Sequence, residues 1–202
     1  MGRSETGACV WAGVDVGARR KGFHLALVDA DRFLYREQAK SADEAVLILE
    51  QWKPALVAVD SPLTPATAGK SRPEEVCLAK AICGIRYTPT RGVVEGGAYY
   101  EWIRCGWVLY DVMKQHAIEA IECFPTASWT VWGGRRSGTR ARWSQGVLLR
   151  QGLEGIPDRL NQDFRDAIAA ALTARAHTRG ASIRFGEIVV PAGLPLVVDC
   201  SG

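Results

Sequence analysis

Apolar residues at the start of the chain fall into three short segments that polar turns separate. The first, residues 8–16, is apolar throughout except at Asp15, the second, residues 23–27, alternates, and the third covers residues 33–37. Short apolar runs and period-two alternation are typical of β-strands. This part of the chain therefore predicts an antiparallel three-stranded meander.

A helix and a further strand follow the meander. Ser41 and Glu44 have the spacing of a capping box, which predicts a helix over Ala42–Trp52 that Pro54 ends. The apolar segment Ala55–Val59 is the next predicted strand. Because a helical crossover joins parallel strands, we expect this strand to lie parallel to the first, in an α/β fold with a mixed sheet.

The rest of the chain predicts four more helices and two more strands. The helices cover residues 73–83, 99–116 and 144–151 and a segment from Pro157 or Asp158 to about Gly180, and the strands cover residues 118–123 and 184–190. Two long loops are expected at residues 85–97 and 128–143. The length fits one domain, so residues 1–202 are predicted to form a single domain with helices flanking the sheet.

Three acidic residues stand near the C-terminal ends of predicted strands: Asp15, Asp60 and Glu122. If these strands are parallel, their ends lie at one edge of the sheet, where open α/β sheets bind ligands. Clustered carboxylates repel one another and need a cation, and Mg²⁺ or Mn²⁺ takes oxygen ligands of this kind. Taken singly, each acid also fits a turn former or a helix cap.

Two more acids, Asp163 and Asp166, are three residues apart on the predicted last helix and share one of its faces. That face continues through Ala167, Ala170 and Ala174, which are small enough for close packing. The pattern predicts a helix that packs on the sheet with its acidic end at the cluster. The alternative is a solvated acidic first turn.

Residues 129–150 hold Arg135, Arg136, Arg140, Arg142 and Arg150 together with three tryptophans and no acid. Arginines neutralise backbone phosphates and aromatic rings stack on bases, so this segment predicts a nucleic-acid contact. Packed tryptophans beside solvated arginines are the alternative. Arg20 and Lys21 follow Asp15 in a turn and are candidate phosphate contacts or a solvated hairpin tip. His24 lies in a predicted strand and is interpreted as a packed histidine, with a catalytic base as the alternative.

Composition excludes several classes of protein. With 48% hydrophobic and 23% charged residues and a net charge of +3, the chain is neither disordered nor membrane-spanning. The six cysteines include no Cys-x-x-Cys pair, so we expect reduced thiols and no structural zinc. Met1–Thr6 has no apolar h-region, and the expected location is the cytoplasm.

The chain resembles the DUF429 family, described as predicted nucleases of the ribonuclease H-like fold. The resemblance is carried, in order, by Gly13–His24, Val57–Leu63, Glu122–Ala127 and Asp163–Ala174. It implies Asp15, Asp60 and Asp166 as catalytic metal ligands, with Glu122 and Asp163 as their partners. The spacing of Asp163 and Asp166 is also similar to that of the paired acids in Holliday-junction resolvases, although those enzymes usually carry Glu where this chain has Asp60. Arg72 and Glu75 resemble a recurring family position without an assigned role.

These residues favour a metal-dependent nuclease that hydrolyses phosphodiester bonds with two Mg²⁺ or Mn²⁺ ions. Asp15 would bridge both ions, and Asp60 and Asp166 would each bind one. A non-catalytic nucleic-acid or protein-binding module of the same fold remains an alternative. A third is a phosphotransferase of the actin-like or sugar-kinase type, because Asp15-Val16-Gly17 resembles the phosphate loop of those proteins. The sequence leaves the choice of DNA or RNA and the oligomeric state open.

Overall fold

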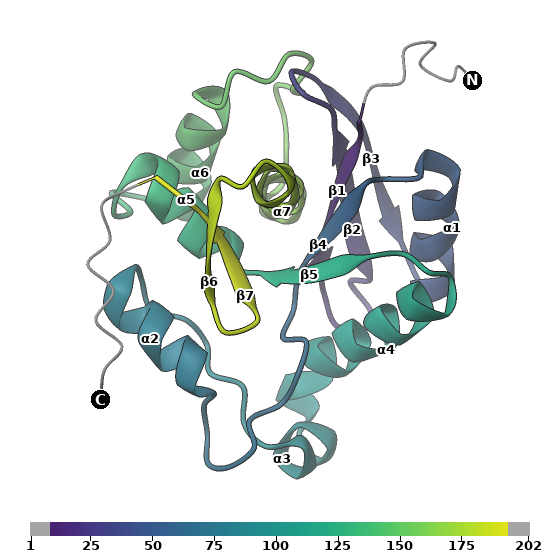
Figure 1. Ribbon diagram of the computed structural model, residues 1–202, viewed down its shortest axis with the longest axis vertical. Coiled ribbons are helices and arrows are strands. Elements are labelled where there is room, and N and C mark those ends of the chain that lie inside the picture. The colour runs from purple at the N-terminus through teal and green to yellow at the C-terminus, as the bar shows by residue number, and fades with distance from the viewer. Residues whose placement is uncertain (1–8, 194–202) are drawn as a thin grey trace.

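A seven-stranded sheet in the order β3-β2-β1-β4-β5-β7-β6 forms the centre of the computed structural model, which describes residues 9–193 (Figure 1). Strands β1, β4, β5 and β7 are mutually parallel, whereas β2, β3 and β6 run antiparallel to their neighbours. This is the predicted mixed sheet with its antiparallel meander. The strands are β1 Trp11–Val16, β2 Phe23–Val28, β3 Phe33–Ala39, β4 Leu56–Asp60, β5 Ala120–Cys123, β6 Ser182–Phe185 and β7 Ile188–Pro191.

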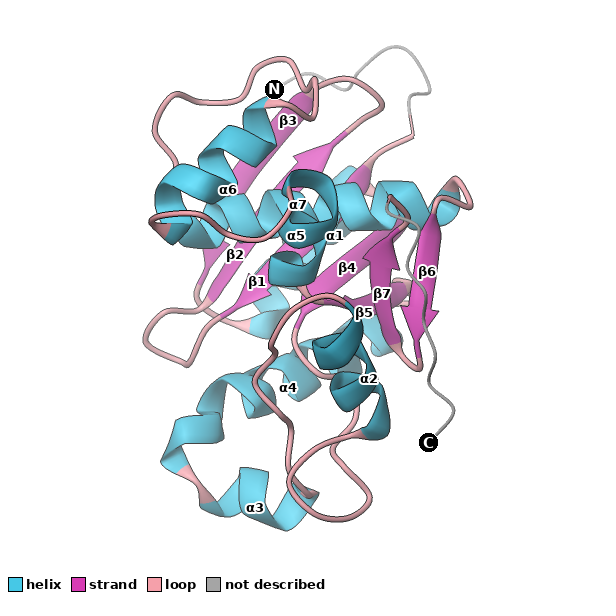
Figure 2. Ribbon diagram, turned by 90° about the vertical axis from the view of Figure 1, so that its left-hand side faces the viewer, coloured by secondary structure: helices cyan, strands magenta, loops and turns pink. Residues whose placement is uncertain are grey.

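Helices cover both faces of the sheet. One face packs against α1 (Ala42–Trp52) and α4 (Glu101–Gln115), and the other packs against α5 (Pro125–Gly133), α6 (Arg140–Leu149) and α7 (Gln162–Thr178). Helices α2 (Pro73–Ala81) and α3 (Arg91–Gly96) and the short helix η1 (Ala98–Tyr100) complete the described chain. Figure 2 shows α2, α3 and α4 grouped below the sheet, apart from α5, α6 and α7.

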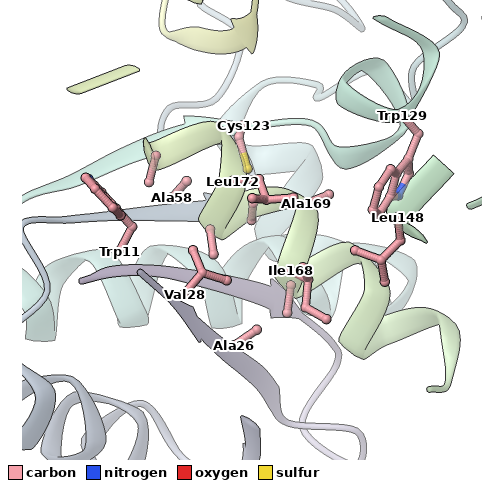
Figure 3. Close-up of a cluster of buried hydrophobic side chains, with 14 of the residues drawn as sticks. Trp11, Ala26, Val28, Ala58, Cys123, Trp129, Leu148, Ile168, Ala169 and Leu172 are labelled. Carbon is pink, nitrogen blue, oxygen red and sulfur yellow. The ribbon is translucent and has the colours of Figure 1, made fainter. Parts of the chain in front are cut away.

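Helix α7 is the buried element that organises one core. Ile168, Ala169 and Leu172 pack with Trp11 and Trp129 in the cluster drawn in Figure 3. The helix lies very close to β1, because a Cβ atom built on Gly13 would stand 2.0 Å from the carbonyl oxygen of Ala167 and 2.8 Å from the Ala170 Cβ. The alanine face predicted from the sequence is therefore the face that contacts the sheet.

The two predicted long loops contain helices. Residues 128–143 include most of α5 and the start of α6, and residues 85–97 include α3. Pro125 occupies the first turn of α5, where proline is tolerated. Thr139 caps α6 through a 3.4 Å hydrogen bond from the Arg142 amide. The glycines in these segments led to the prediction of loops. The proline in the first turn of α5 and the Thr139 cap of α6 are nevertheless sufficient to begin helices there.

Other boundaries also differ from the sequence predictions. The last helix begins at Gln162, not at Pro157 or Asp158, because the Asn161 side chain caps it through a 2.8 Å bond from the Phe164 amide. The single final strand is instead the hairpin of β6 and β7. Residues 9–193 contain no helix long and apolar enough to cross a membrane.

The expectation of reduced cysteines is confirmed for Cys9, Cys83, Cys105 and Cys123, which are free thiols. It is wrong for Cys77, which is disulfide-bonded. No spacing in the sequence signals this bond, because the cysteines are dispersed along the chain. The interpretation of Met1–Thr6 concerns residues outside the described range.

Candidate functional site

Three of the predicted acids meet where β1 and β4 end beneath α7. Asp15 and Asp60 are direct partners in the parallel register of β1 and β4. Side chains alternate along a strand, so Asp15 shares the α7 face with Trp11, and Asp60 shares it with Ala58. Asp166, near the start of α7, is close enough to raise the pKa of both. These three residues are called the acid triad below.

Burial and mutual repulsion disfavour the charged forms of the acid triad. Burial, followed by the charges of Asp166 and Asp163, raises the pKa of Asp15 to about 8. Burial and then the charge of Asp15 raise the pKa of Asp60 well above its usual range. Oδ2 of Asp15 is buried and has no hydrogen-bond partner among the described residues. A buried, unpaired carboxylate oxygen beside two further carboxylates fits a divalent cation.

Asp166 is positioned by three donors. The Trp129 indole donates a 2.9 Å bond and the Gln162 amide a 3.0 Å bond to Oδ1, and the Arg140 guanidinium donates a 2.8 Å bond to Oδ2. Burial raises the pKa of Asp166, although Arg140 and these bonds oppose the shift. Arg140 and Trp129, both from the predicted basic segment, therefore contact the acid triad directly.

A cavity of about 990 Å³ opens over the acid triad. Basic side chains join the acids in its lining, namely Lys21, Arg72, Lys80, Arg86, Arg135, Arg136 and Arg140. Within the described chain, Arg20 and Arg142 are not among the lining residues. Trp129 is fully buried and Trp143, which lines the cavity, is 8% exposed, so both tryptophans pack in the core.

The chain matches a known protein family over most of its length. A family model described as "Protein of unknown function (DUF429)" matches residues 13–189, which is most of the chain and spans the whole acid triad. The chain belongs to the DUF429 family. No curated protein matches the sequence of this DUF429 protein.

The fold of the DUF429 protein is similar to that of RuvC from Thermus thermophilus. RuvC in complex with a Holliday junction substrate matches with a TM-score of 0.54 and 16% identity, over 85% of this chain and 96% of that chain. A second RuvC structure from the same organism matches with a TM-score of 0.49 and 17% identity, over 85% of this chain and 96% of that chain. The ribonuclease H-like fold implied by the sequence is confirmed.

Asp163 lies beside the acid triad of the DUF429 protein, and two residues of the β1–β2 hairpin face it. Lys21 Nζ is 2.5 Å from Asp163 Oδ1, and His24 Nε2 is 3.8 Å from Oδ2. Burial lowers the pKa of Lys21, but the hydrogen bond to Asp163 and the charges of Asp15, Asp163 and Asp166 together outweigh it, so the pKa is raised overall. Burial lowers the pKa of His24. Asp15, His24 and Asp163 each offer a ligand atom within 4.8 Å of the others.

Glu122 lines the same cavity as the acid triad of the DUF429 protein but lies on the other face of the sheet. Its neighbours on β5, Ile121 and Cys123, face α7, so alternation directs Glu122 to the opposite side of the sheet. There its carboxylate accepts two bonds from Arg72 and a 2.8 Å bond from the Leu63 amide. The charge and bonds of Arg72 lower the pKa of Glu122, but burial outweighs them and raises it overall.

Arg72 also joins Glu122 to the start of α2. Its Nε donates a 3.1 Å bond to Glu75, which accepts a further bond of 2.6 Å from the Thr88 hydroxyl. Arg72 is 2% exposed and Glu75 fully buried. This buried network gives the family position at Arg72 and Glu75 a structural role: it ties β5, α2 and the segment around Thr88 together beside the cavity.

Sequence reasoning missed three contributors to the site. The sequence shows Trp129 only as one of several aromatic residues, because no local pattern reports a bond to an acid 37 positions away. The pairing of Arg72 with Glu122 spans 50 positions and is equally invisible. His24 did carry a signal, since an antiparallel hairpin centred on residues 17–22 places it opposite Asp15.

Proposed function

We propose that this DUF429 protein is a metal-dependent nuclease that hydrolyses phosphodiester bonds with Mg²⁺ or Mn²⁺ at the acid triad. The observation that carries the proposal is the unpaired, buried Oδ2 of Asp15 among converging carboxylates at the bottom of an arginine-lined cavity. The fold supports it, since a protein of the same fold has been solved with a Holliday junction substrate.

Each acid has a proposed role. Asp15 interacts with the charges of the neighbouring acids and would bridge two ions. Asp60 and Asp166 would each hold one ion. Asp163 would be a further metal ligand, or would orient another metal ligand. Such ions supply a nucleophile at neutral pH and stabilise charge on the leaving oxygen. Glu122, assigned to the metal set from the sequence, is proposed instead to position the end of β5 through Arg72.

Arg135 and Arg136 would bind the substrate. Both line the cavity that contains the acid triad and are exposed, and guanidinium groups neutralise backbone phosphates. Arg140 donates to Asp166, so it would balance the charge of the acids as well as contact a phosphate. The proposed substrate class is nucleic acid.

The test is cleavage of a panel of single-stranded, duplex and branched DNA and RNA with Mg²⁺ or Mn²⁺. We expect Asp15→Asn to abolish cleavage and to weaken divalent-ion binding in calorimetry while circular dichroism stays native. Asp111→Asn, an exposed acid on α4, is the matched control and should behave as the unmodified protein. A chain that neither cleaves any substrate nor binds divalent ions would contradict the proposal.

The ion pair between Arg140 and Asp166 favours a second candidate, a nucleic-acid-binding module without catalysis, because it places a protein cation on the acid triad. In that case the unmodified protein binds nucleic acid but does not cleave it with any divalent ion. Asp15→Asn would then leave the affinity for nucleic acid intact.

A further inference from the structure

His24 stands opposite Asp15 across the β1–β2 hairpin and has its ring between two acids. It is Asp15's partner in the antiparallel register, which places both side chains on the same face. Nδ1 of His24 is 4.0 Å from Asp15 Oδ2, and Nε2 is 3.8 Å from Asp163 Oδ2. His24 is 3% exposed, so this arrangement lies inside the protein.

Neither atom of the pair between His24 and Asp15 is satisfied. Within residues 9–193, both Nδ1 of His24 and Oδ2 of Asp15 are buried without a hydrogen-bond partner. Leaving two facing polar atoms unpaired in the interior is destabilising. Metal–ligand lengths of about 2.0–2.2 Å for nitrogen and oxygen allow two ligand atoms on opposite sides of one ion to stand up to about 4.2 Å apart. The separation of 4.0 Å is therefore one that a shared cation spans.

The surroundings of His24 fix its ring in this orientation. Phe164 packs edge-on against the imidazole with a centroid distance of 4.9 Å. Lys21 holds Oδ1 of Asp163, which leaves Oδ2 directed at Nε2 of His24. At 3.8 Å this oxygen is beyond hydrogen-bond length from Nε2, so it acts on the ring as a nearby negative charge.

We propose that His24 is a nitrogen ligand, through Nδ1, of a divalent ion shared with Asp15, and that this position favours first-row transition ions over Mg²⁺. The inference rests on the proposed metal site. Its chemical basis is that imidazole suits transition metals, whereas Mg²⁺ prefers sites built from oxygen alone. Asp163 places its negative charge beside the opposite ring nitrogen.

Mn²⁺ bound to the full chain is the probe, because pulsed electron paramagnetic resonance detects nitrogen coordinated to this ion. We expect a ¹⁴N modulation in the unmodified protein and its loss in His24→Asn. The ratio of Mn²⁺ to Mg²⁺ affinity should fall about tenfold or more in that variant. His116→Asn and His177→Asn are the matched controls, because the chain has three histidines, and both should keep the modulation.

A second measurement needs no mutation and so does not depend on the folding of His24→Asn. Labelling the histidines of the unmodified chain with ¹⁵N must replace the ¹⁴N modulation by the ¹⁵N pattern. Bound Mn²⁺ without nitrogen modulation would overturn the role of His24 and leave the acid triad as the site. Absence of Mn²⁺ binding would overturn this inference, and absence of both Mg²⁺ and Mn²⁺ binding together with absence of cleavage would overturn the proposed function as well.

Discussion

The indole nitrogen of Trp129 donates a 2.9 Å hydrogen bond to Oδ1 of Asp166. Trp129 is fully buried and packs against α7 in one core cluster (Figure 3). The bond therefore joins that core to the acid triad. It fixes one carboxylate oxygen and leaves Oδ2 to Arg140.

Replacing Trp129 by Phe tests this positioning role. The ring remains apolar and large, but the bond to Asp166 is lost, which costs about 1–3 kcal/mol of unfolding free energy. Loss of such an outer partner of a metal ligand lowers metal affinity or activity by about 10–100-fold. Calorimetric Mn²⁺ titration measures the effect. Trp132→Phe is the control, and equal losses in the two variants would assign the effect to packing alone.

Breaking the ion pair of Arg72 with Glu122 should strongly destabilise the protein. Glu122→Gln leaves the guanidinium of Arg72 buried without its main counter-charge, which costs about 3–5 kcal/mol and lowers the Tm by roughly 10 °C for a domain of this size. Thermal unfolding is the measurement. Glu187→Gln is the matched control, because Glu187 is 3.8 Å from Arg72 with a 40% exposed side chain, and it should change the Tm by about 2 °C at most.

The cavity arginines should set the salt dependence of nucleic-acid binding. Replacing Arg135 and Arg136 with Gln removes two phosphate contacts, so the slope of log affinity against log salt concentration should become shallower by about 2. Fluorescence anisotropy at several salt concentrations measures it. The control replaces Arg142 and Arg150, exposed residues at α6. A larger loss in the control pair would place the contact outside the cavity.

The raised pKa of Asp15 predicts how the stability of the metal-free protein depends on pH. Folding favours the protonated carboxyl, so this contribution is fully present below the unfolded pKa of 3.8 and is lost as the pH rises through about 8. Asp15→Asn removes the charge that burial penalises. It should therefore raise the Tm in the presence of a chelator, and by more at pH 8 than at pH 5. An unchanged or lower Tm at pH 8 would contradict this account.

The acid triad could be predicted from the sequence. The signals for its residues are either local in the chain or follow from how the strands are connected. Asp15 and Asp60 end apolar strands on either side of a helical crossover, which makes the strands parallel and brings the two acids together. The alanines after Asp166 predicted a close-packed helix, and the contact of α7 with Gly13 confirms it. The role of these acids as metal ligands stays a prediction.

Glu122 and Trp129 show why the rest of the site was not predictable. Glu122 also lies near a strand end. Because side chains alternate along a strand and its two neighbours face α7, Glu122 is directed to the other side of the sheet. Predicting the face on which Glu122 lies would have required knowing its position in the strand to within one residue. Trp129 sits on a helix where its glycine- and arginine-rich surroundings indicated a loop, and its burial depends on tertiary packing that composition does not report.

The contact at Gly13 has a consequence for engineering the site. The main chain of α7 lies directly against the main chain of β1. The spacing between Asp15 and Asp166 is therefore set by this backbone contact and not by the packing of side chains between the two elements. Core redesign elsewhere in the sheet would leave that spacing unchanged. Adjusting the site to an ion of different radius would therefore require a longer or shorter acidic side chain, and Asp60, at the end of β4 and outside this β1–α7 contact, is the position to change.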